Sequence, residues 1–230
     1  MANLIAYLDA SGSVVDPKCR ILTIAGYVAA EEQWESFAID WRKSLVDFGV
    51  NNLHMKDFAH SRGEFQSWKG DESRRAQFLM RLVEVIRLHL VESFGVSLNM
   101  HHYRMVDQSS MMTERLGAYA MVAAAAIGGI EKWQKLHRGG DTLTIYLEKG
   151  DAQQNSLLTL GARTGLQEGL TPKFISKNGG SDKECSALQA ADFLAYEQAK
   201  CLTDWTVKGK TIGRESLFHL SDRQRVGSQT

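Results

Sequence analysis

The chain has 230 residues, of which 43% are hydrophobic and only two are proline. This composition supports a sizeable core, and because no Pro-, Ser- or Gly-rich linker interrupts the chain, one domain is favoured over two. Lys plus Arg and Asp plus Glu both total 27, so there is no global field to attract nucleic acid or an anionic membrane. Any contact with nucleic acid must therefore be local.

The cysteines Cys19, Cys185 and Cys201 are odd in number and lack metal-type spacing, which indicates reduced thiols in a cytoplasmic protein. The N-terminal residues have no basic segment followed by a long apolar one, so no signal peptide is expected. The Ala-rich run at 121–127 is too short to span a membrane and is typical of a buried helix. We therefore expect no membrane partner, and no sequence feature fixes the oligomeric state.

Hydrophobic periodicity predicts an α/β fold with a mixed sheet flanked by helices and a helical insertion after a first β-hairpin. Strand-type runs lie at 3–8, 20–30, 94–100, 141–148 and 173–176, and helical spacing at 31–48, 71–93, 113–136, 153–168 and 184–202. Trp34 and Trp41 are at helical spacing and are expected in the core. The domain is placed at 1–202 and a polar tail at 203–230.

Two predicted strands end in an acid, Asp9 after LIAYL and Glu148 after LTIYL. Ligands gather at the carboxyl ends of parallel strands in α/β sheets, so both side chains are expected to face a crevice. On the last predicted helix, Asp192 lies three residues after Gln189 among apolar residues, where an unpaired carboxylate is costly. Something must compensate its charge.

A divalent cation is one such compensator, because Mg²⁺ takes oxygen ligands and needs only two or three carboxylates. From spacing alone, roles without a metal ion are favoured for these acids. Asp9 stands before Ser-Gly-Ser and fits an Asx-turn, and Asp192 fits an ion pair with Lys200 or an arginine. Asp151 fits the N-cap of the following helix better than a metal site.

The segments YLDASGS at 7–13 and LQAADFLAYE at 188–197 together resemble the family named domain of unknown function 3800. That family carries an N-terminal Asp-Glu-Ser-Gly type motif and a C-terminal Gln-x-x-Asp type motif on a ribonuclease H-like fold. LHMKDF at 53–58 looks like its His-containing segment, and YLEKGD at 146–151 like its strand-end acid. The resemblance spans about residues 4 to 200.

The resemblance implies a metal-dependent nuclease that binds Mg²⁺ or Mn²⁺ and cleaves phosphodiester bonds of RNA or DNA. Asp9, Glu148 and Asp192 would hold the metal, and Gln189 and His54 would act beside them. Nucleic acid is the implied partner. One departure is Ala10, which stands where the family has Glu. Adjacent strand residues point to opposite faces, so this change need not weaken a site built on Asp9.

Two further stretches contain basic side chains that could contact a phosphate. His54 and Lys56 lie in a loop-like stretch, where the histidine could act as a general base or simply be hydrogen-bonded. Lys173, Lys177 and Lys183 surround a Gly-Gly turn before the last helix. They are placed either for phosphate contact or in a solvated loop.

Two alternatives to a nuclease remain. The first is a non-catalytic interaction module of a mobile-element or phage-related system, which Ala10 and the neutral net charge favour. The second is a nucleotide-binding ATPase of the actin and sugar-kinase type, which shares the strand-end Asp followed by glycine. That class needs two more Gly-rich phosphate turns, and the segments at 139–141 and 178–182 do not fit them well.

Overall fold

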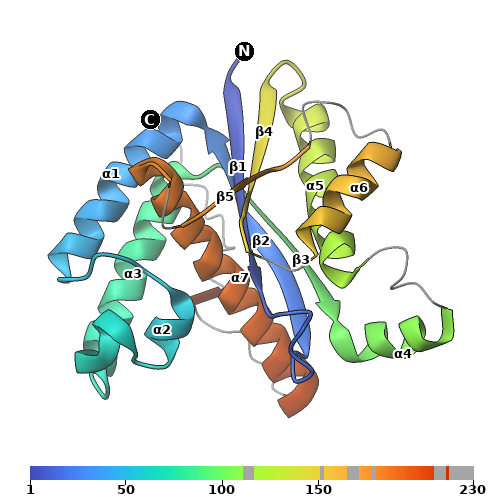
Figure 1. Ribbon diagram of the computed structural model, residues 1–230. Helices are drawn as coiled ribbons and strands as arrows, with labels where there is room; N and C mark the ends of the chain where they lie inside the picture. The colour runs from blue at the N-terminus through green and yellow to red at the C-terminus, as the bar shows by residue number, and fades with distance from the viewer. Residues whose placement is uncertain (111–116, 151–152, 165–170, 178–179, 210–215, 218–230) are drawn as a thin grey trace.

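A five-stranded mixed sheet lies between two layers of helices (Figure 1). The strands are ordered β3-β2-β1-β4-β5, and β1 is antiparallel to β2 but parallel to β4. They comprise β1 (Asn3–Ser11), β2 (Ile21–Ala30), β3 (Glu92–Asn99), β4 (Thr142–Glu148) and β5 (Lys173–Ile175). The computed structural model describes residues 1–110, 117–150, 153–164, 171–177, 180–209 and 216–217. The prediction of an α/β fold with a mixed sheet is confirmed.

The predicted helical insertion lies between β2 and β3. It contains α1 (Glu31–Asp47), α2 (Met55–Ala59), a 3-10 helix η1 (Gly63–Trp68) and α3 (Glu72–His89). The other helices are α4 (Met100–Ser110), α5 (Ala118–His137), α6 (Gln154–Thr164) and α7 (Asp182–Lys208). Helices α1, α2, α3 and α7 lie on one side of the sheet and α4, α5 and α6 on the other (Figure 1).

Alternation along β1 supplies both cores, since successive side chains of a strand point to opposite faces. Ile5 and Tyr7 pack in the core under α7, whereas Leu4, Ala6 and Leu8 pack in the core under α5. The central strand is therefore apolar at nearly every position, as expected for a strand that is buried on both faces.

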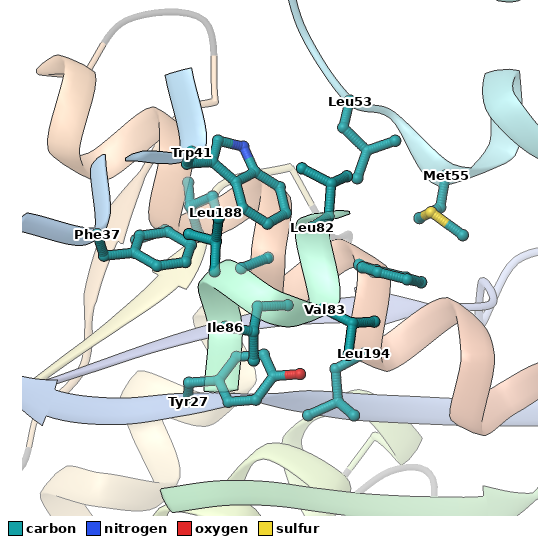
Figure 2. Packing of buried hydrophobic residues seen from close by; sticks show 14 of the residues in the cluster. Tyr27, Phe37, Trp41, Leu53, Met55, Leu82, Val83, Ile86, Leu188 and Leu194 are labelled. Atoms are coloured by element: carbon teal, nitrogen blue, oxygen red, sulfur yellow. The ribbon is translucent and has the colours of Figure 1, made fainter. Parts of the chain in front are cut away.

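The core under α7 is rich in aromatic side chains. Trp34 and Trp41 have no exposed surface, as their helical spacing predicts, and Trp34 Nε1–H donates to the Ile5 carbonyl oxygen over 2.9 Å. Figure 2 shows Trp41 among apolar side chains that include Phe37, Leu53 and Leu188. This core joins α1, the loop before α2, and α7, so it fixes the elements that carry the candidate site.

Helix α7 is longer than its periodicity predicts at both ends. Its start is set by a capping box in which Ser181 N–H donates to Glu184 and Glu184 N–H donates to the Ser181 hydroxyl. It ends at Gly209, whose φ of 62° is the left-handed conformation of many helix C-termini. The tail predicted from 203 therefore begins inside this helix.

Sequence reasoning missed the short elements α2, η1 and α4, whose few apolar residues give too little periodicity. The predicted helical positions 113–116 and 165–168, and Asp151, lie outside the described residues. All three cysteines are free thiols, as expected. Among the described helices, none is long and apolar enough to cross a membrane.

Candidate functional site

Three acids from separate elements meet at the carboxyl end of β1. The parallel register of β1 with β4 ends at the pair Leu8 and Leu147, so the next residues, Asp9 and Glu148, are neighbours. Both side chains point to the face covered by α7, because Tyr7 and Tyr146, two residues earlier in each strand, pack on that face. Asp192 approaches from α7 itself. The predicted convergence of these acids is confirmed.

The three carboxylates converge on the ammonium group of Lys177. Lys177 Nζ lies 2.6 Å from Asp9 Oδ2, 3.1 Å from Glu148 Oε2 and 3.7 Å from Asp192 Oδ2. Within the described ranges, no second basic side chain comes within 4.0 Å of these acids. When all three acids are ionised, one ammonium therefore leaves two negative charges uncompensated. We call these four residues the carboxylate cluster.

Burial makes this excess charge costly. Asp9 is 2% exposed and Asp192 is 7% exposed, and Glu148 is half-buried. Burial raises the pKa of Asp9 well above its usual range; Lys177 opposes this rise, and the charges of Asp192 and Glu148 add to it. Burial alone would lower the pKa of Lys177, but the three carboxylates raise it above its ordinary value. The site thus favours added positive charge.

Asp192 is held in place by the start of α2. Its Oδ2 atom accepts a hydrogen bond of 2.9 Å from the Met55 backbone N–H, which is the first N–H of that helix. The carboxylate therefore has a fixed orientation toward both α2 and Lys177. The alternative in which Asp192 pairs with Lys200 is wrong: Lys200 pairs with Asp204, and the basic group near Asp192 is Lys177.

Gln189 lies beside the cluster and fixes the loop before α2. Its Oε1 accepts from Trp41 Nε1–H over 3.0 Å and from Leu53 N–H over 2.9 Å, and its Nε2 donates to Asn52 Oδ1 over 3.2 Å. The resemblance implies that Gln189 helps to orient a ligand or substrate. Its amide is bonded to buried protein partners, so any effect on a ligand passes through this loop.

His54 stands between Leu53 and Met55, whose N–H groups bind Gln189 and Asp192. Its own side chain is half exposed and its Nδ1 lies 3.0 Å from Asp57 Oδ2. The structure thus brings the backbone of His54 to the site while its ring pairs with Asp57. The prediction of a loop-like stretch around His54 is partly wrong, since α2 begins at Met55.

Ala10 faces away from the carboxylate cluster. Its side chain packs against the core under α5, on the opposite side of the sheet from Asp9. A longer acid at this position would point into that other layer. An alanine at this position therefore leaves the oxygen atoms of the cluster unchanged. Asp9 itself lies inside β1, paired with Ala25, and not in the turn that an Asx-turn requires.

Lys177 is the residue whose role sequence reasoning missed. It follows β5, which pairs in parallel with β4 so that Ile175 stands opposite Glu148. The rule that selected Asp9 and Glu148, a polar residue just past the carboxyl end of a strand, would also have selected Lys177. The solvated-loop alternative is wrong for Lys177, whose side chain is 16% exposed, and Lys183 is paired with Glu31 and Glu35.

The cluster has the donor chemistry of a divalent-cation site, since carboxylate oxygens are the ligands that Mg²⁺ and Mn²⁺ prefer. In the present arrangement the Lys177 ammonium lies among these oxygens. In the described ranges, no set of three or more His, Cys, Asp and Glu side chains is disposed to hold a metal ion. The three carboxylates fit such an ion in chemistry and charge, provided that the Lys177 ammonium moves away from them.

Comparison with known proteins adds no family assignment. Neither a scan against protein-family models nor a search of curated proteins finds a match to this chain.

Proposed function

We propose that the protein is a metal-dependent nuclease of ribonuclease H-like fold that cleaves phosphodiester bonds of RNA or DNA. The observation that carries the proposal is the meeting of Asp9, Glu148 and Asp192 around a single ammonium group. Segments far apart in the chain bring these oxygens together with fewer positive charges than negative ones. The resemblance of the same three residues to a ribonuclease H-like family supports the same conclusion.

Asp9, Glu148 and Asp192 would hold Mg²⁺ or Mn²⁺. When bound, such an ion activates water and neutralises charge on a phosphodiester. The chain's own residues set the geometry. Asp192 is oriented by Met55 N–H, and Gln189 fixes the preceding loop through Leu53 N–H, so both acid and loop are held before substrate arrives.

Lys177 would change its role when a divalent cation enters. Its side chain has a four-carbon stem, so the ammonium can leave the carboxylates and remain near the site as a donor to a phosphate oxygen. His54 lies on the loop that Gln189 and Asp192 hold. Its ring, half exposed beside Asp57, would assist as a general base once it turns from that partner.

A nuclease assay with matched variants tests the proposal. Labelled single- and double-stranded RNA and DNA are incubated with Mn²⁺ and the wild type, Asp9→Asn or Asp192→Asn, with Asp47→Asn as control. Asp47 is an acid on α1 that pairs with Lys43 away from the cluster. We expect cleavage by the wild type and the control and its loss in the two cluster variants. Equal cleavage by all four proteins, or by none, rejects the proposal.

A second candidate is the non-catalytic interaction module, and the position of Lys177 favours it. An ammonium 2.6 Å from Asp9 and 3.1 Å from Glu148 can stay in the cluster permanently as part of a structural ion pair. In that case Mn²⁺ would not raise the thermal stability of the wild type. A nuclease of this kind must bind the metal ion, and a ligand that binds only the native state raises the thermal stability of the protein.

A further inference from the structure

A second polar pocket lies at the end of β2 and β3, apart from the carboxylate cluster. Its volume is about 360 Å³, and its lining consists of Arg20, Asn99, His101, His102, Trp205 and Thr206. These residues come from the loop before β2, the end of β3, the start of α4 and the last turns of α7. No acidic side chain is among them, so the lining favours an anionic ligand.

The fold fixes the walls of this pocket. The register of β2 with β3 pairs Ile21 with Asn99, and Met100 N–H donates to the Arg20 carbonyl oxygen over 2.9 Å. The Asn99 side chain accepts from the backbone N–H groups of His101 and His102 over 3.0 and 3.2 Å. Both histidines are therefore held at the first turn of α4, beside Arg20.

The side chains that line the pocket are available to a ligand. In the described part of the chain, the Arg20 guanidinium has no carboxylate within 4.0 Å and no hydrogen-bond partner, and its side chain is exposed. The rings of His101 and His102 contact each other at a centroid distance of 5.7 Å and are also exposed. A guanidinium beside two imidazoles is a set of donors suited to a phosphate.

Trp205 adds an aromatic surface to these donors. It is 59% exposed, whereas Trp34, Trp41 and Trp68 are buried and Trp133 is half-buried. A large exposed aromatic ring next to a cationic pocket is typical of sites that stack a nucleic-acid base while a basic group contacts the backbone. The pocket thus offers two contacts to one nucleotide: basic groups for its phosphate and an aromatic ring for its base.

The pocket and the carboxylate cluster lie at the same end of the sheet. The carboxyl end of β1 is adjacent to the start of β2 and the end of β3. Along α7, Asp192 and Trp205 are thirteen residues apart, which is about 20 Å at the α-helical rise of about 1.5 Å per residue. This span equals about six nucleotides of a stacked strand at about 3.4 Å each.

We propose that this pocket binds one nucleotide of a single-stranded nucleic acid, with its phosphate on Arg20 and the two imidazoles and its base on Trp205. The inference rests on the proposed function in one respect, that the ligand is a nucleic-acid strand long enough to reach the carboxylate cluster. Binding at the pocket itself needs no metal ion and none of the three acids.

The test measures binding by fluorescence anisotropy in EDTA, so that no cleavage occurs. The probes are labelled oligothymidylate and oligouridylate of about 12 nucleotides, within the usual range of single-strand sites. Unlabelled thymidine and uridine monophosphates serve as competitors. The variants are Arg20→Ala, Trp205→Ala and Trp205→Phe. Arg87→Ala, which removes an exposed arginine from α3, is the matched control.

We expect Arg20→Ala and Trp205→Ala each to weaken oligonucleotide binding about tenfold, the scale of one lost backbone contact or one lost base stack. Trp205→Phe should keep most of the affinity, since it retains an aromatic face, and Arg87→Ala should match the wild type. The salt dependence of binding should become shallower in Arg20→Ala. Because the altered side chains are exposed, the variants should fold, as circular dichroism would verify.

Three results would overturn the inference: no binding by the wild type, unchanged binding by both alanine variants, or mononucleotides that bind as tightly as the oligonucleotide. The nuclease assay is separate. If Asp9→Asn cleaves like the wild type while Arg20→Ala and Trp205→Ala lose the oligonucleotide, the proposed function fails and this inference stands. If the pocket variants bind normally while Asp9→Asn loses cleavage, the inference fails and the proposed function stands.

Discussion

Lys177 and Asp9 are 168 residues apart in the chain, yet the ammonium of one lies 2.6 Å from a carboxylate oxygen of the other. Asp9 is almost fully buried, and Lys177 is 16% exposed. The same ammonium is shared with Glu148 and Asp192. This shared ammonium stands where a divalent cation would best neutralise the site, so the behaviour of Lys177 separates a metal site from a structural ion pair.

Replacing Lys177 by methionine should destabilise the protein in EDTA by about 3 kcal/mol at neutral pH, the scale of breaking a buried ion pair from one side. The cause is that three acids would lose their nearby positive charge. Added Mn²⁺ should restore the free energy of unfolding and raise it more than in the wild type. Urea denaturation in EDTA and in Mn²⁺ measures both effects.

Lys173→Met is the matched control for this experiment. Lys173 lies on β5 and is exposed, with its ammonium over the Tyr146 ring at 5.7 Å. Its loss should change the free energy of unfolding little in either condition. A Lys177→Met protein that Mn²⁺ does not stabilise would show that the carboxylates form no cation site.

Gln189→Ala should destabilise the protein by about 2–4 kcal/mol, because two buried N–H donors, from Trp41 and Leu53, lose their common acceptor. Its effect on Mn²⁺ affinity should be small, since Gln189 touches none of the three carboxylates within the described contacts. Gln77→Ala on the surface of α3 is the control. Unchanged stability with weakened Mn²⁺ binding would instead identify Gln189 as a metal-site residue.

Ala10→Glu introduces the acid that the resembling family carries, but it should not improve Mn²⁺ binding or cleavage. Ala10 packs on the core under α5, so the new carboxylate would enter that layer and cost about 1 kcal/mol of stability. Ala10→Gln has the same size without the charge and should cost less. Tighter Mn²⁺ binding by Ala10→Glu would mean that this side chain reaches the cluster after all.

Tyr27→Phe should stabilise the protein by about 1 kcal/mol, because the Tyr27 hydroxyl is buried without a hydrogen-bond partner in the described part of the chain. Burial also raises the pKa of Tyr27, so the hydroxyl stays neutral across the usual pH range. Thermal melting should show an increase of about 2–4 °C for a chain of this length. Tyr119→Phe, which removes a part-buried hydroxyl that accepts from Gln154 Nε2 over 3.5 Å, should lower the melting temperature.

Periodicity was sufficient to predict all five strands and the long helices, because the apolar residues of each element repeat at the period of its structure. It missed α2 and α4. The first N–H of α2, at Met55, is held by Asp192, 137 residues away, so the start of α2 depends on a contact that no local pattern records. The start of α4 is capped locally by Asn99, which accepts from His101 N–H, and hydrophobic periodicity does not use such a cap.

The candidate site was also predictable in part from local patterns in the sequence. Asp9, Glu148 and Asp192 are marked by strand ends and by an acid among apolar residues, and the structure brings them together. The partner of these acids was not predictable from spacing. Lys177 directly follows the strand predicted at 173–176, but that pattern assigns its side chain either to a phosphate or to solvent and does not show that its ammonium lies among the three acids. The role of Gln189 depends on a loop whose path only the fold fixes.

Counting Mn²⁺ ions by electron paramagnetic resonance, as the protein is titrated with the metal, tests the central claim most directly. We predict saturable binding by the wild type, tighter binding by Lys177→Met, and its loss in both Asp9→Asn and Asp192→Asn. The Asp47→Asn protein should bind like the wild type. Identical binding curves for the wild type and the two cluster variants would contradict the claim that these acids share one cation.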